Sequence, residues 1–255
     1  MARKSDYIAV FDSGVGGTSV LRHLLHILPN ERYIYFGDSA NAPYGTKDTQ
    51  QIKALVMELA EKLIGRGVKA LVVACNTATG AAIRDLREAY PDTIVVGVEP
   101  ALKPAADKYP GGHIGVMATP VTLQSEKFSR LLERFSQDHK ITLLPAPGLA
   151  DLVEAGKQNS PKGQALLEEL LGGYRDELDA LVLGCTHYPF AADAIRKVLG
   201  PKTELFDGGE GTAAQTRRWL ENKGLLYDGP GEVLVENSLN CPQIISLTRK
   251  FAGLE

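Results

Sequence analysis

The sequence predicts an α/β protein of two similar parallel-sheet domains, related by a pseudo-two-fold axis, with a ligand site in the cleft between them. Three observations support this fold. Short apolar runs alternate with helical periodicity, the pattern recurs halfway along the chain, and two matched segments end in cysteine. Strands that alternate with helices form parallel sheets covered on both faces. Such sheets bind ligands at the carboxyl ends of their strands.

Short apolar runs give the candidate strands, and helical spacing fills the gaps between them. The clearest helix has apolar residues at helical intervals from Ile52 to Ile64. Asp48 can cap its start, and Gly65 or Gly67 can end it. The predicted strands are residues 7–11, 33–36, 70–74, 93–98, 113–117, 141–144, 180–184, 204–206 and 232–235.

Three segments recur in the same order at a nearly constant offset, which indicates two related units. The Pro- and Gly-rich stretch 100–112 joins these units. We predict a discontinuous first domain of residues 1–98 plus 208–255, and a second domain of residues 99–207. The paired segments are YIAVFDSGVGG from Tyr7 and HIGVMATPVTL from His113, KALVVACNTA from Lys69 and DALVLGCTHY from Asp179, and VVGVEPALKPA from Val95 and TELFDGGEGTA from Thr203.

The composition argues against several classes of protein. The chain has 28 Lys and Arg against 31 Asp and Glu, a net charge of −3, and no block of one sign, so neither a nucleic-acid nor a membrane partner is indicated. Only a short apolar run precedes Asp12, which fits neither a signal peptide nor a membrane span. Three cysteines are too few for a disulfide scaffold, and free thiols indicate a reducing, cytoplasmic location.

In the segments LVVACNT and LVLGCTH, Cys75 and Cys185 directly follow the predicted strands 70–74 and 180–184. Both thiols precede polar residues and occupy the same position of the repeat. These features favour a chemical role for the two cysteines over the alternative, in which they are only small apolar side chains of the core. We expect each cysteine to open a helix, whose N-terminus would stabilise the thiolate and lower the thiol pKa towards neutrality. Cys241 lacks this setting, and we interpret it as structural.

A zinc site and a thiol hydrolase are alternative interpretations. Cys75, Cys185 and His187 could supply three zinc ligands, but the sequence has no CxxC or HxxxH spacing and no evident fourth ligand, so no metal is predicted. A hydrolase with a cysteine nucleophile and His187 as base would leave the second thiol and the repeat unexplained.

Polar segments after other predicted strands supply further candidates. Residues 12–18, DSGVGGT, lack the spacing of a P-loop or a dinucleotide-binding loop and indicate an anion site or a tight turn. Asp12 could cap this turn, bond a substrate ammonium or tune a thiol. Residues 37–45 are typical of a loop that lines a site, or of an ordinary connector. Residues 118–122 offer hydroxyls at the repeat position of Asp12, and Glu154 is by default an exposed carboxylate.

Six motifs occur in a fixed order over nearly the whole chain: FDSGVGG, YFGDSANAPYG, ACNTA, ATPVTLQS, LVE-x-G and GCTHYPF. This combination resembles the glutamate racemases of the aspartate/glutamate racemase family. The resemblance implies facing α/β domains, no cofactor, and a homodimer that makes D-glutamate from L-glutamate for peptidoglycan. His187 favours glutamate, because the related aspartate racemases usually carry Glu there. Ala78-Thr79-Gly80 departs from the more usual Ala-Ser-Ala.

By motif match, the resemblance implies that Cys75 and Cys185 are the acid/base pair. It implies polar helpers at Asp12, Asp38, Glu154 and His187. Substrate contacts are predicted for Asp12, Ser13, Tyr44, Gly45, Asn76, Thr77, Thr119, Thr122, Thr186 and His187, with Thr119 and Thr122 taken from the repeat position.

Racemisation removes a proton from one face of Cα and adds one to the other, which suits a matched pair of thiols. One thiolate abstracts while the opposite thiol donates, and the roles reverse for the other enantiomer. With no evident pyridoxal motif, N–H and hydroxyl groups near Asn76 and Thr186 would stabilise the carbanion. We predict that Asp12 serves Cys75 and that His187 serves Cys185. The alternatives are an aspartate racemase and a non-catalytic amino-acid-binding module.

Overall fold

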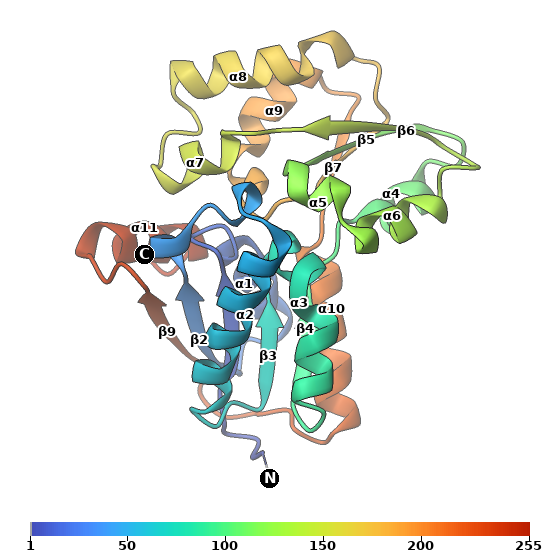
Figure 1. The fold of residues 1–255 in the computed structure, drawn as a ribbon. Coiled ribbons are helices and arrows are strands. Elements are labelled where there is room, and N and C mark those ends of the chain that lie inside the picture. The colour runs from blue at the N-terminus through green and yellow to red at the C-terminus, as the bar shows by residue number, and fades with distance from the viewer. Residues whose placement is uncertain (1) are drawn as a thin grey trace.

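The computed structural model describes residues 2–255 and contains two parallel β-sheets, one above the other in Figure 1. This confirms the prediction of two parallel-sheet α/β domains, and each predicted strand is present with its ends within two residues. The strands of the first sheet are β1 (Ile8–Asp12), β2 (Arg32–Gly37), β3 (Ala70–Val73), β4 (Ile94–Gly97) and β9 (Glu232–Asn237). Those of the second are β5 (His113–Ala118), β6 (Lys140–Pro145), β7 (Ala180–Leu183) and β8 (Glu204–Asp207).

The repeat in the sequence is a repeat of topology. The first sheet has the strand order β4-β3-β1-β2-β9, and the second has the order β6-β5-β7-β8. Reading the second sheet backwards gives β8-β7-β5-β6, which matches the first four strands of the first sheet one for one. β9 is the addition, because the last part of the chain returns to pair in parallel with β2. The division at residues 98–99 and 207–208 stays a prediction.

Helices cover both faces of each sheet (Figure 1). In β1, Ile8 and Val10 pack with one layer of helices, while Ala9 and Phe11 pack with the other, because successive side chains of a strand point to opposite faces. The helices around the first sheet are α1 (Thr18–Ile27), α2 (Thr49–Ile64), α3 (Asn76–Ala89), α10 (Gly209–Asn222) and α11 (Pro242–Ala252). Those of the second unit are α4 (Leu102–Lys108), α5 (Pro120–Gln124), α6 (Glu126–Glu133), α7 (Leu149–Glu154), α8 (Pro161–Leu171) and α9 (Ala192–Leu199).

The ends of α2 confirm the capping prediction. The Asp48 side chain accepts a hydrogen bond from the Gln51 N–H at 2.9 Å, and Gly65 follows the last turn. The apolar stripe of the helix, which includes Ile52 and Val56, is buried against the first sheet. Hydrophobic burial therefore fixes the face of α2 that meets the sheet.

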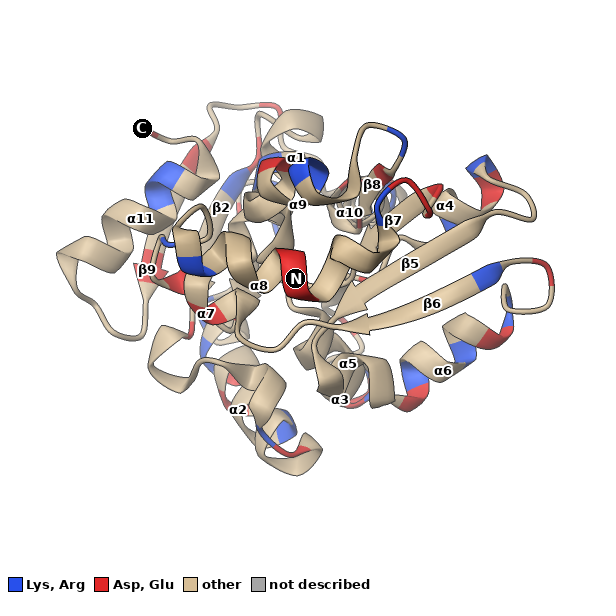
Figure 2. Cartoon of the chain, turned by 90° about the horizontal axis from the view of Figure 1, so that it is seen from above, with Lys and Arg blue, Asp and Glu red and all other residues tan. Residues whose placement is uncertain are grey.

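Charged residues of both signs are mixed along the outer helices, as on α6 in Figure 2. Within residues 2–255, no helix combines the length and the apolar character that a membrane crossing requires.

Candidate active site

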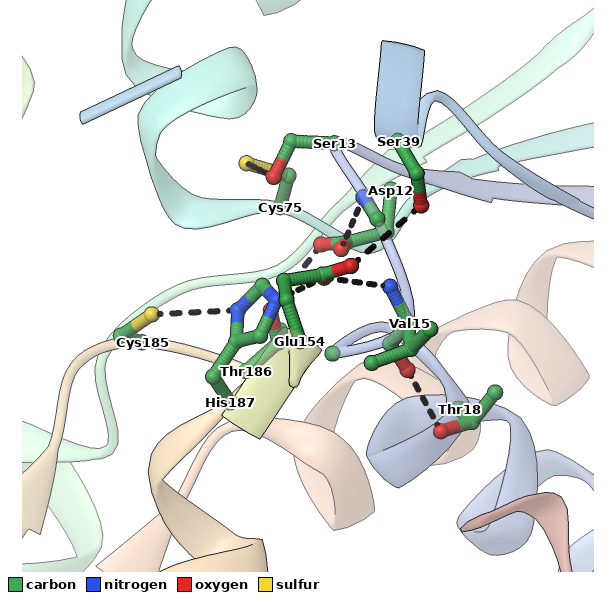
Figure 3. Close-up of polar contacts among 12 residues, drawn as sticks. Asp12, Ser13, Val15, Thr18, Ser39, Cys75, Glu154, Cys185, Thr186 and His187 are labelled. Carbon is green, nitrogen blue, oxygen red and sulfur yellow. Dashed lines mark hydrogen bonds and ion pairs between the residues drawn. The ribbon is translucent and has the colours of Figure 1, made fainter. Parts of the chain in front are cut away.

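The two predicted thiols line one cavity. Cys75 follows β3 and forms the N-cap of α3, where its Sγ accepts a hydrogen bond from the Ala78 N–H at 3.4 Å. Cys185 follows β7, the strand that corresponds to β3 in the second sheet. Figure 3 shows the thiols on different segments of the chain, with Ser13 beside Cys75 and His187 beside Cys185. Equivalent strand ends of the two units thus meet at the same cavity.

Most of the predicted site residues line this cavity, and three lie behind it. Asp12, Asp38 and Thr122 are buried but are not part of the lining. The predicted residues that form the lining are Ser13, Tyr44, Gly45, Cys75, Asn76, Thr77, Thr119, Glu154, Cys185, Thr186 and His187.

Asp12 is fully buried and connects the two units. One carboxylate oxygen accepts a hydrogen bond from the Gly14 N–H, and the other accepts one from the Thr186 hydroxyl, both at 2.9 Å. Burial raises the pKa of Asp12 above its usual value, although the charge of His187 opposes this effect. The residue therefore caps its turn and also holds the segment that carries Cys185.

His187 joins Cys185 to Glu154. Its Nδ1 lies 3.6 Å from the Cys185 Sγ, and its Nε2 lies 2.6 Å from Glu154 Oε1. Burial acts to lower the pKa of His187, but its hydrogen bonds to Cys185 and Glu154 and the charge of Asp12 raise this pKa well above its usual value. Burial acts to raise the pKa of Glu154, yet His187 holds it below its usual value. The pair is thus a carboxylate and an imidazolium at neutral pH.

Glu154 also reaches across to the first unit. Its Oε1 accepts a hydrogen bond from the Val15 N–H at 2.7 Å, and its Oε2 accepts one from the Ser39 hydroxyl at 3.3 Å (Figure 3). The expectation of an exposed carboxylate is wrong, because only 18% of the side chain is accessible to solvent.

The glycines of residues 12–18 allow this close approach. A Cβ at Gly14 would lie 1.9 Å from Glu154 Oε1, and a Cβ at Gly16 would lie 2.3 Å from His187 Nδ1. Side chains from the second unit therefore occupy the space that a larger residue would need. The anion that this loop holds is the carboxylate of Glu154, bonded to the Val15 N–H.

The family model for Asp/Glu/hydantoin racemases matches residues 8–216. The chain belongs to this family. It is 47% identical to the glutamate racemase of Clostridium novyi (strain NT) over 251 residues, which cover 97% of each chain. The glutamate racemase of Thermus thermophilus, solved with β-chloro-D-alanine, superimposes with a TM-score of 0.81 at 37% identity and covers 98% of this chain and 94% of its own. The glutamate racemase of Francisella tularensis, solved with D-glutamate, superimposes with a TM-score of 0.84 at 29% identity. This match also covers 98% of this chain and 94% of the other.

In this racemase, two expectations about the thiols are wrong. The pKa of Cys75 is raised to about 12 rather than lowered, because burial and the charge of Asp12 outweigh the N–H group of Ala78 at the start of α3. Cys185 does not open an α-helix, since a 3₁₀ turn, Tyr188–Ala191, comes before α9. At Cys75, burial and a neighbouring carboxylate therefore outweigh the N-terminus of α3.

Asp38 and Thr122 lie behind the cavity of the racemase and hold residues that line it. The Asp38 carboxylate accepts a hydrogen bond from the Tyr44 hydroxyl at 2.7 Å and two from the Asn41 amide. The Thr122 hydroxyl lies 3.0 Å from that of Thr77 and 2.9 Å from that of Thr119. Both residues therefore fix the shape of the site from outside it.

The sequence prediction missed the segment that follows β6. Ala146, Pro147, Gly148, Ala150 and Asp151 all line the cavity of the racemase. In the topological repeat β6 corresponds to β2, and residues 37–45, which follow β2, have a composition typical of a loop that lines a site. Extending the repeat to this pair of strands would have identified the second loop.

Proposed function

We propose that this racemase interconverts L- and D-glutamate without a cofactor, with Cys75 and Cys185 acting on opposite faces of Cα. The observation that carries the proposal is the position of the two thiols, which follow equivalent strands of the two units and line one cavity. Two proton-transfer groups in one cavity allow a carbon to be inverted without moving a single base across it, whereas binding alone requires no such pair. The names of the relatives support glutamate as the substrate.

Groups around Cys75 are suited to hold the amino acid. The buried Oδ1 of Asn76 has no hydrogen-bond partner in the described structure, and buried polar atoms ordinarily have one. The N–H groups of Asn76 and Thr77, in the first turn of α3, have no helical carbonyl to bond. We infer that these groups bond the substrate, with the helix N-terminus stabilising the α-carboxylate as it gains charge.

The electrostatics give the two thiols different starting roles. With its pKa near 12, Cys75 is a thiol at neutral pH and is ready to donate a proton. Cys185 lies in a different setting, because the Nδ1 atom of the His187 imidazolium is 3.6 Å from its sulfur. We therefore infer that Cys75 donates and Cys185 abstracts in one direction of the reaction, and that the roles reverse in the other.

The proposal is tested by exchange in deuterium oxide. With L-glutamate and no added cofactor, we expect optical rotation to fall and deuterium to enter Cα. Early in the reaction deuterium should be found mainly in the new D-glutamate, because a second group delivers the proton. Equal labelling of recovered L-glutamate would contradict the two-base mechanism. Absence of exchange would favour a binding module, and release of ammonia or a hydrolysed product would favour a thiol hydrolase.

The pairing of helpers with thiols is tested by Asp12→Asn and His187→Asn. The two enantiomers of glutamate have equal free energies, so kcat/KM must stay equal in the two directions for any variant. The pairing must therefore be observed in kcat for each direction. We expect the two variants to shift the ratio of the two kcat values in opposite senses. A ratio unchanged from that of the parent protein in both variants would count against the pairing.

Aspartate is the alternative substrate. A site shaped for glutamate is expected to discriminate by about 10- to 200-fold in kcat/KM against a substrate one methylene shorter. Equal kcat/KM values for the two amino acids would contradict the preference for glutamate.

We further propose that the protein is a cytoplasmic homodimer that supplies D-glutamate for peptidoglycan. Light scattering of the purified protein tests whether it is a dimer.

A further inference from the structure

Glu154 is held from its far side by residues outside the cavity. Ser39 lies in a 3₁₀ turn after β2, Ser39–Asn41, and its hydroxyl is 3.3 Å from Glu154 Oε2. The amide nitrogen of Asn237, the last residue of β9, donates a hydrogen bond to the same hydroxyl at 2.9 Å. Neither residue lines the cavity. We infer that Ser39 and Asn237 are positioning residues that act on Cys185 through Glu154 and His187.

The direction of each hydrogen bond follows from the donors present. The Asn237 side chain is fixed in orientation, because its Oδ1 accepts from the Leu239 N–H at 3.0 Å and its amide nitrogen can only donate. The Ser39 oxygen therefore accepts from Asn237, and its single proton remains for Glu154. Asn237 is 6% exposed, so water does not readily replace this contact.

The contact with Ser39 holds the second oxygen of the Glu154 carboxylate. Oε1 accepts from the Val15 N–H and is paired with His187, while Oε2 is bonded to Ser39. The last torsion of a glutamate side chain has a broad, weakly restricted profile. With Ser39 in place the carboxylate plane is held, so Oε1 stays 2.6 Å from His187 Nε2 and His187 Nδ1 stays 3.6 Å from the Cys185 sulfur.

Three ionisable groups face His187: Glu154 from α7, Asp12 from β1 and Cys185 from the end of β7. Ser39 contacts one of these three groups, Glu154. Removing its hydroxyl should therefore weaken the support that His187 receives from Glu154 while Asp12 stays in place. His187 Nδ1 is then held less firmly at its distance of 3.6 Å from the Cys185 sulfur. The inference rests on the proposed function only in treating Cys185 as an acid/base group.

The test compares Ser39→Ala and Ser39→Thr with a matched control. Ser238→Ala removes a hydrogen bond from the same turn, since the Ser238 hydroxyl accepts from the Ala40 N–H at 2.9 Å, but it does not touch Glu154. The rate of alkylation of each cysteine by iodoacetamide at pH 7 is followed by peptide mass spectrometry. This rate reports the thiolate and needs no turnover.

We expect Ser39→Ala to slow the alkylation of Cys185 by about three- to tenfold, the effect of one hydrogen bond, and to lower kcat for glutamate by a similar factor. Ser39→Thr should restore the alkylation rate of Cys185 and kcat. The control Ser238→Ala should change neither quantity by more than about twofold. The alkylation rate of Cys241 should be the same in all variants. A parent-like rate at Cys185 in Ser39→Ala, or an equal loss in Ser238→Ala, would overturn the inference. If Cys185 alkylation slows as expected but the parent protein does not racemise glutamate, the positioning role stands and the proposed function fails.

Discussion

Replacing either Cys75 or Cys185 by serine is expected to lower kcat/KM for glutamate by at least about 10²–10⁴-fold, the usual contribution of one general acid or base. Each turnover uses both thiols, one to remove a proton and one to supply it. The loss should therefore be the same from L-glutamate and from D-glutamate. Chiral chromatography of the products from each enantiomer measures both rates.

Cys241 provides the matched control for these variants. It is also a free cysteine, but it packs in an apolar cluster with Ile244 and Phe251 and does not line the cavity. Cys241→Ser should keep the parent activity. Each single variant at the cavity should still exchange the α-proton of the one enantiomer that its remaining thiol can reach. A single variant that racemises at the parent rate would contradict the two-thiol mechanism.

Lys69→Met is expected to lower the free energy of unfolding by about 3–5 kcal/mol. The Lys69 ammonium lies 2.5 Å from Glu31 Oε2, and the two side chains are 0% and 1% exposed. It also donates to the Leu225 carbonyl at 2.9 Å, while Glu31 Oε1 accepts from the Tyr227 N–H at 3.0 Å. Removing the ammonium leaves a carboxylate buried without its counter-charge, which is the costly case for an ion pair. Urea denaturation followed by circular dichroism measures the change.

Two further variants separate the effect of burial from that of charge. Lys69→Met combined with Glu31→Leu should recover most of the lost stability, because replacing both charges by apolar groups leaves none unpaired. Lys62→Met breaks a pair with Glu58 in which both side chains are more than half exposed, and it should leave the denaturation midpoint unchanged. A Lys69→Met protein as stable as the parent would show that the carboxylate is neutralised or hydrated in another way.

The strands and the two thiols could be predicted because their signals are local or repeated. Each apolar run is visible within a few residues, and the repeat places Cys75 and Cys185 at equivalent strand ends without any knowledge of distances. The role of Glu154 could not be deduced from the residues in this way, since its partner Ser39 is 115 residues away in the sequence. The contact between Ser39 and Asn237 spans 198 residues. Neither contact leaves a pattern in the nearby sequence.

The prediction that the pKa of Cys75 is lowered was wrong for a related reason. A helix N-terminus can be predicted from the sequence, and it does follow Cys75 in the structure. The opposing effects are the burial of Cys75 and the carboxylate of Asp12, which lies on β1, the strand that pairs with β3. Both effects arise only when distant parts of the chain pack together. Local structure therefore predicted one contribution to the pKa, and tertiary structure supplied the larger one.

The return of β9 to the first sheet has a consequence for biosynthesis. While the chain emerges from the ribosome, β5 to β8 become available together and can form their sheet early. The edge of β2 that pairs with β9 stays open until Glu232–Asn237 has been translated, after all four strands of the second sheet. We expect nascent chains stalled before β9 to be more sensitive to proteases around β2 than chains stalled after β9 has emerged, and pulse proteolysis of stalled chains would measure this difference.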